Sequence, residues 1–94
     1  MRTLISELSK NYRSFKLRYL LYEECDNFSD QIFFSLLIEK RNEHENDYKA
    51  IRNFTNSRKV AEKVLKKLYA GNVTPVGLPY IIEDFIISQY LVNI

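Results

Sequence analysis

The sequence predicts an α+β fold, in which a three-stranded antiparallel meander is followed by two helices packed on one sheet face. Three observations lead to this prediction. Apolar residues alternate with a two-residue period between residues 15 and 54, they recur at helical spacing after residue 57, and the strand connections are short and polar. The chain has 94 residues, is 46% hydrophobic and contains two glycines and two prolines, so one small domain over residues 1–94 is expected.

The N-terminal segment, residues 1–14, is the part that these patterns define least. Ile5, Leu8 and Tyr12 would share one side of a helix, so residues 3–12 fit a short amphipathic helix. A helix of this length has little stability of its own. A frayed, mobile terminus, or a segment that folds only on a partner, is therefore the alternative interpretation.

Three strands are expected next. The first covers residues 15–24, where buried and exposed positions alternate. A polar connection leads to the second strand over residues 31–41, which is apolar on both faces near its middle and is therefore predicted to be central. The solvated loop 42–47 joins it to the third strand over residues 48–54.

The first helix, over about residues 57–70, is predicted from an apolar stripe. Its start offers Thr55, Asn56 and Ser57 as caps, because their side-chain oxygens can accept hydrogen bonds from the free amides of the first turn. It is expected to end at Gly71-Asn72, because glycine takes the left-handed conformation without steric penalty. The stripe consists of Val60, Val64, Leu65 and Leu68.

The second helix has a less regular start. Thr74 caps and Pro75 suits the first helical position, but Pro79 removes a hydrogen bond about one turn later. A 3₁₀-like turn over residues 75–78 and a regular helix from Pro79 to about Tyr90 are therefore expected. The inner face of this helix would consist of Leu78, Ile82, Phe85 and Ile86, with Gln89 as a further candidate.

The sheet face that carries no helices raises the question of what covers it. In the predicted register this face holds Leu20, Tyr22, Phe33 and Leu37, which is too apolar a set for full exposure. Either the N-terminal segment or a second copy of the chain would cover it. The pattern therefore predicts a homodimer, with the N-terminal segment as the alternative cover. A structural homodimer of unknown role is one alternative to the function that is predicted below.

Charge is distributed unevenly although the net charge is only +2. Residues 25–47 carry two basic and six acidic side chains, whereas residues 48–71 carry seven basic and one acidic. Within the second group, Lys59, Lys63, Lys66 and Lys67 fall on one side of the first helix. Such a stripe can bind phosphates, which makes a DNA-binding regulator using residues 57–70 one hypothesis, or it can be a solvated face or a contact for an acidic partner.

No pattern in the sequence indicates catalysis, a metal site or a cofactor, and the protein is not expected to be an enzyme. His44 is the only histidine and lies in a solvated acidic loop. Glu83 and Asp84 are adjacent on a helix and point about 100° apart, so they cannot face each other as an acid and base pair. The acidic neighbours of Cys25 disfavour a reactive thiolate.

The sequence also favours a cytoplasmic location. The single cysteine, Cys25, fits a reducing compartment. No apolar run approaches the roughly 18 residues that a membrane-spanning helix needs, and the N-terminus lacks a long apolar signal core.

The stretches NFTNSRKV and LYAGNVTPVGLPYIIEDFI resemble a family of small proteins, without assigned activity, from anaerobic endospore-forming bacteria. The resemblance covers roughly residues 15–87 and is most specific over residues 72–85, although Gly77 and Pro79 depart from the more helix-favouring residues of that family. The chain also looks like the excision directionality factor of the prophage-like element that interrupts a sporulation sigma-factor gene. This resemblance implies a factor without chemistry of its own that binds a large serine recombinase and promotes DNA excision during sporulation.

These observations together predict a non-enzymatic factor that works by binding another protein. Any contact with nucleic acid would then be indirect. Aromatic and basic side chains dominate protein interfaces, so the partner-binding surface is sought among them. The predicted partner-binding residues are Tyr22, Phe33, Lys59, Lys63, Lys66 and Lys67.

Overall fold

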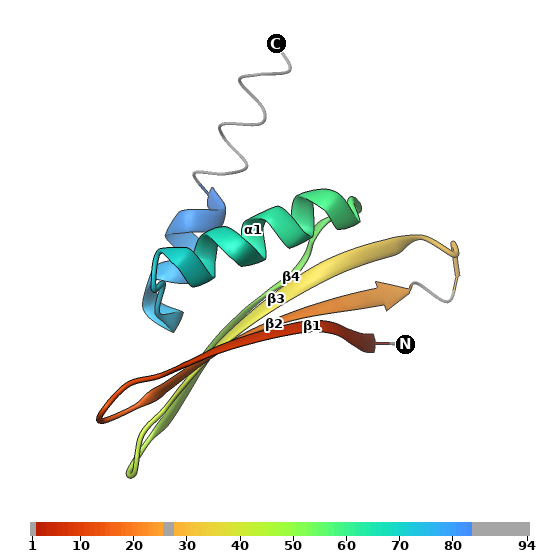
Figure 1. The fold of residues 1–94 in the computed structure, drawn as a ribbon. Coiled ribbons are helices and arrows are strands. Elements are labelled where there is room, and N and C mark those ends of the chain that lie inside the picture. The colour runs from red at the N-terminus through yellow and green to blue at the C-terminus, as the bar shows by residue number, and fades with distance from the viewer. Residues whose placement is uncertain (1, 26–27, 84–94) are drawn as a thin grey trace.

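The computed structural model describes residues 2–25 and 28–83, and within them the chain forms a four-stranded antiparallel sheet with helices on one face (Figure 1). The α+β class is confirmed, but the prediction of three strands is wrong because the N-terminal segment is a strand too. The elements are β1 (Arg2–Asn11), β2 (Lys16–Cys25), β3 (Ile32–Arg41), β4 (Asn46–Thr55), α1 (Arg58–Ala70) and the 3₁₀ helix η1 (Pro75–Gly77), after which residues 78–83 are helical.

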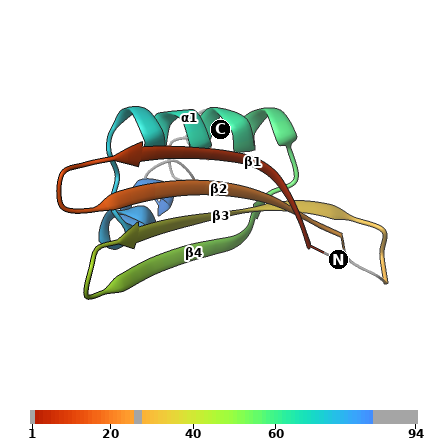
Figure 2. The same cartoon turned by 60° about the horizontal axis from the view of Figure 1, so that its bottom comes forward.

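The sheet is a meander, as predicted, in which each strand pairs with its neighbour in the chain. The strand order is β1-β2-β3-β4, so β2 and β3 are the inner strands (Figure 2). Tight turns join the outer hairpins: the Tyr12 amide donates to the Phe15 carbonyl at 2.8 Å, and the Asn42 amide to the Glu45 carbonyl at 2.9 Å. Short loops of this kind fix the antiparallel register.

β1 replaces the short helix that was predicted over residues 3–12. It pairs with β2 along its whole length, but Leu4 and Ser6 pair with consecutive residues of β2, which leaves Ile5 as the extra residue of a bulge. Ile5 and Leu8 both pack against the core although they are three residues apart. The bulge therefore produces the three-residue spacing that suggested a helix.

β4 carries a second irregularity. Leu36 pairs with Ile51 and Phe34 with Thr55, so β4 contains more residues than β3 over this stretch. Asn53 lies in the left-handed region with φ 54°, and its amide donates to the buried Ser35 hydroxyl at 2.9 Å. The hydroxyl thus satisfies an amide that the bulge removes from the ladder.

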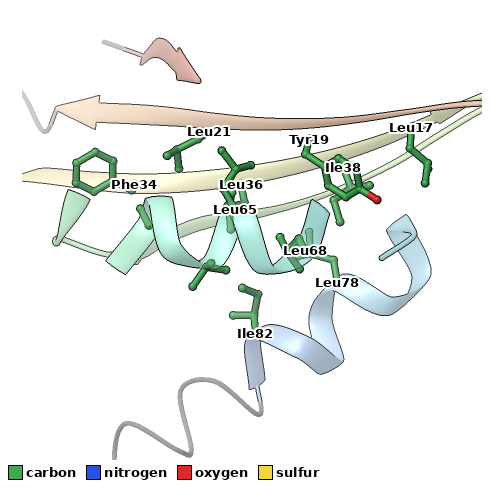
Figure 3. Close-up of a cluster of buried hydrophobic side chains, with 12 residues drawn as sticks. Leu17, Tyr19, Leu21, Phe34, Leu36, Ile38, Leu65, Leu68, Leu78 and Ile82 are labelled. Atoms are coloured by element: carbon green, nitrogen blue, oxygen red, sulfur yellow. The ribbon is translucent and has the colours of Figure 1, made fainter. Parts of the chain in front are cut away.

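The core lies between the sheet and the helices (Figure 3). Alternate side chains of β2 and β3 point to this side, and the apolar stripe of α1 packs on them, as the two-residue and helical periods require. The buried cluster consists of Leu17, Tyr19, Leu21, Phe34, Leu36, Ile38, Ala61, Val64, Leu65, Leu68, Leu78 and Ile82.

α1 begins and ends at the predicted positions, but the left-handed residue at its end differs from the prediction. The Ser57 hydroxyl caps the first turn by accepting from the Val60 amide at 3.2 Å. At the other end Gly71 has φ −87°, and the residue in the left-handed conformation is Asn72, with φ 53°. The prediction of a left-handed Gly71 is therefore wrong; asparagine also tolerates this conformation.

The end of α1 is a Schellman motif closed by two backbone hydrogen bonds. The Val73 amide donates to the Leu68 carbonyl at 3.1 Å, and the Asn72 amide to the Tyr69 carbonyl at 3.3 Å. The side-chain oxygen of Asn72 accepts hydrogen bonds from the Tyr12 hydroxyl, at 2.7 Å, and from the Lys10 ammonium. Asn72 therefore joins the helix end to the β1–β2 hairpin.

We expect Asn72→Ala to lower the free energy of unfolding by about 1–3 kcal/mol, because alanine is strained at positive φ and lacks the acceptor. Asn72→Gly removes only the acceptor, so it should cost less than Asn72→Ala. Urea denaturation of the two variants measures both contributions. Equal losses would contradict the backbone contribution.

The last helix follows the predicted course as far as the structure describes it, except that the predicted cap is wrong, because the Thr74 side chain makes no capping hydrogen bond. The 3₁₀ turn covers Pro75–Gly77, and residues 78–83 continue as helix with Leu78 and Ile82 buried. Phe85 and Ile86, and the predicted end near Tyr90, lie outside the described residues.

Candidate functional site

The sheet surface opposite α1, here called the outer face, is not covered by any helix that the structure describes (Figures 1 and 2). Its apolar centre consists of Leu4, Leu20, Tyr22, Leu37 and Ala50, which the strand register brings into two adjacent rows. Leu20 is buried at 3% exposure, whereas Leu4 is 45% exposed. The N-terminal segment extends the sheet as β1 instead of covering this face, so that alternative is wrong.

Arg18 forms ion pairs with two neighbouring strands at one end of the apolar centre. Its Nε donates to Glu7 on β1 at 2.7 Å, and its Nη1 lies 3.4 Å from Glu39 on β3. The guanidinium therefore bridges three strands. The hydrogen bond to Glu7 raises the pKa of Arg18, and the charge of Glu39 adds to this effect.

Glu24 accepts two side-chain hydrogen bonds at the other end of the apolar centre. Its carboxylate accepts from the Ser35 hydroxyl at 2.6 Å and from the Arg52 guanidinium at 2.9 Å. These two hydrogen bonds, that of Ser35 first, hold the pKa of Glu24 below its ordinary value. Nearby, the Arg2 guanidinium lies 3.9 Å from the centre of the Tyr22 ring. Charges on this face are thus partnered within the chain.

The opposite side of the molecule carries the lysines of α1. Lys59, Lys63, Lys66 and Lys67, here called the lysine face, are all exposed and lie across the helix from its buried stripe. Within residues 2–25 and 28–83, no ion pair involves any of the four. The i,i+4 pair between Arg58 and Glu62, at 3.1 Å, lies beside them.

A groove of about 400 Å³ runs between β4 and the turn that contains η1. Its exposed apolar side chains are Val76 and Tyr80, at 72% and 68% exposure, whereas Tyr48 borders it from β4 and pairs with Glu39, so its side chain belongs to the outer face. Its full lining, here called the β4 groove, consists of Asp47, Tyr48, Lys49, Pro75, Val76, Pro79 and Tyr80. No pattern in the sequence predicted this groove. The available signal was that Val76 and Tyr80 are apolar yet lie off the Leu78–Ile82 stripe of the last helix.

The residues considered for chemistry do not assemble into a reactive site. His44 is exposed at the β3–β4 turn, 4.0 Å from Glu43. Cys25 is exposed at the end of β2. Glu83 is exposed, and Asp84 lies outside the described residues. Among the residues that the structure places, no three metal-ligating side chains come together.

The six predicted partner-binding residues lie on two opposite sides of the fold. Tyr22 and Phe33 are half-buried on the outer face, Tyr22 beneath Arg2 and Phe33 beside a shallow hollow lined by Asp30, Gln31, Ile32 and Asn56. The four lysines are on the helical side. The four lysines therefore lie close to one another, but Tyr22 and Phe33 are on the opposite side of the molecule.

Comparison with known proteins gives one match. The sequence family described as a family of unknown function (DUF6514) matches residues 1–88. The chain belongs to this family. The match covers every described element of the DUF6514 fold, from β1 to the last helix. No curated protein and no solved structure matches the chain. Among the described residues of this DUF6514 chain, no helix is long and apolar enough to cross a membrane.

Proposed function

We propose that the protein is a non-enzymatic factor that acts by binding another protein through the β4 groove. The observation that carries the proposal is the pair of Val76 and Tyr80, two largely exposed apolar side chains beside one hollow that β4 borders at Asp47, Tyr48 and Lys49. Apolar and aromatic side chains at a concave site are typical anchors of protein interfaces. Phosphate recognition, in contrast, requires cations and does not need such a pair.

The most concrete partner is a large serine recombinase, and the action is to favour excision of a prophage-like element in the cytoplasm of sporulating cells. This part of the proposal rests on the resemblance described above. Such a factor needs no chemistry of its own. It must bind the excision-competent complex more tightly than the competing complex, and a coupling of roughly 1–3 kcal/mol changes the balance about 5- to 150-fold.

The direct test measures binding of the purified chain to a purified large serine recombinase in the presence of nuclease. Tyr80→Ser should weaken binding at least tenfold, because truncating an aromatic anchor removes about 2 kcal/mol or more. Phe28→Ser is the matched control, since Phe28 is fully exposed and lies outside the groove. Equal binding by both variants would contradict a site in the β4 groove, and no binding by the wild type would contradict the recombinase as partner.

The second candidate function is direct DNA binding, which the lysine face favours because its four charges have no ion-pair partner in the described part of the chain. Lys63→Glu combined with Lys67→Glu should then abolish retention on duplex DNA, and retention by the wild type should fall steeply with salt. Salt-independent retention would contradict this function. A recombinase contact that survives nuclease treatment favours the first function over the second.

A further inference from the structure

We propose that the outer face is the contact surface of a homodimer, in which the sheet of one chain packs face to face on the sheet of a second copy. Val76 and Tyr80 of the β4 groove lie on the helical side of the sheet, and only Tyr48 at the β4 edge is shared with this surface, so the inference does not depend on the proposed function. It would place two grooves and two lysine faces on the outside of a symmetric pair.

The distribution of polarity on the outer face resembles that of an interface between copies. Leu4, Leu20, Tyr22, Leu37 and Ala50 form the apolar centre. The groups with charge border it, with Arg18, Glu39 and Arg41 at one end, Glu24, Arg52 and Arg2 at the other, and Glu7 at the β1 edge beside Leu20. An apolar centre bordered by polar groups is the usual anatomy of a protein interface.

Charge complementarity indicates that the molecule bound to the outer face is a second copy of this chain. In a two-fold dimer the same patch must face itself, so the patch cannot carry a large charge of one sign. The charged side chains with ion-pair or ring contacts on this face are four arginines and three glutamates, and each glutamate contacts an arginine of its own chain. Burial of this face therefore leaves no carboxylate without a counter-charge. The lysine face cannot meet itself in this way, because its charges have one sign.

The area is sufficient. Four strands spaced about 4.8 Å apart and ten residues long give a flat projected area of roughly 600 Å². The accessible area is larger than this projection because side chains protrude from the sheet. A standard interface buries about 800 Å² per partner. The outer face is therefore of the size that a stable pair requires, and none of the described helices obstructs it.

The test is sedimentation equilibrium of the full chain. The wild type should have twice the 11.2 kDa mass of one chain at tens of micromolar, and it should dissociate on dilution. Leu4→Glu places a charge in the apolar centre at a position that is already 45% exposed in the single chain, so it should keep the fold and raise the dimer dissociation constant at least tenfold. Val76→Glu, the matched control on the helical side, should remain dimeric.

Ala50→Glu is a second variant on the opposite edge strand, and it should weaken the dimer in the same way. Far-UV circular dichroism of each variant verifies the fold. A monomeric wild type at the highest concentration overturns the proposal without reference to any variant. So does a folded Leu4→Glu or Ala50→Glu variant that dimerises like the wild type, and so does equal dissociation by Val76→Glu.

Discussion

Leu68→Ala should lower the free energy of unfolding by about 2–5 kcal/mol. Leu68 has no exposed surface and lies on the last turns of α1, where the sheet and the last helix meet it (Figure 3). Its truncation removes buried contacts and leaves a cavity between the sheet, α1 and the last helix. These packed elements cannot move far enough to fill it. In a domain of this size the loss is a large fraction of the total stability.

Urea denaturation of Leu68→Ala measures this effect. Lys67→Ala is the matched control, because it is the preceding residue of the same helix and is exposed. The control should change the free energy of unfolding by no more than about 0.5 kcal/mol. A similar loss in both variants would show that helix propensity, and not burial, explains the result.

The second large effect is a loss of stability in alkali through Tyr19. This side chain is fully buried, and its hydroxyl donates to the Val73 carbonyl at 2.9 Å. Burial raises the pKa of Tyr19 from 10.0 to about 12, and the neighbouring Tyr12 and Tyr69 add to this effect.

The sign of the effect follows from linkage. Below pH 10 Tyr19 is protonated in both the folded and the unfolded chain, so its contribution to stability is fully present. Between pH 10 and about 12 the unfolded chain loses this proton first, and the free energy of unfolding falls with rising pH. A difference of two pKa units corresponds to about 2–3 kcal/mol once both states are ionised.

The measurement is the free energy of unfolding from pH 8 to 12 for the wild type and for Tyr19→Phe. The variant should lose about 1 kcal/mol at pH 8, because the Val73 carbonyl loses its donor. The difference between the two proteins should then shrink and reverse as the pH rises through the window. If the free energy of unfolding falls equally with pH in both proteins, the pKa of Tyr19 is not raised in the folded chain.

The inner strands and α1 could be predicted from sequence because their periodicity is uninterrupted. Leu17, Tyr19 and Leu21 alternate without a break, and Val64, Leu65 and Leu68 keep helical spacing. Each of these elements was predicted to within a few residues of its bounds.

β1 could not be predicted in the same way. A bulge inserts one residue, so side chains three apart reach the same side of the sheet, as they do in a helix. Ile5 and Leu8 are such a pair. Spacing alone does not distinguish a helix from a bulged strand. The segment becomes a strand because it pairs with β2, and that contact forms only in the tertiary fold.

The candidate site was predicted only in part. The lysine face depends on helical periodicity, and its four side chains are exposed on α1 as that periodicity predicts, whereas their role in binding stays a prediction. The β4 groove depends on how η1 packs beside a strand more than twenty residues earlier, and no local pattern contains that contact. The division of the predicted residues between two opposite faces follows from the same packing, because Tyr22 and Phe33 belong to the side of the sheet that α1 does not touch.

The two bulges have a consequence for solubility. They lie in β1 and β4, the strands at the two edges of the sheet. A regular exposed edge is a template for further strands and for fibril growth, and a bulge interrupts the ladder that an incoming strand would need. Neither edge of this sheet offers an unbroken ladder of ten residues. Aggregation by edge addition is therefore disfavoured, whereas contact through a sheet face forms a closed two-fold pair that cannot grow.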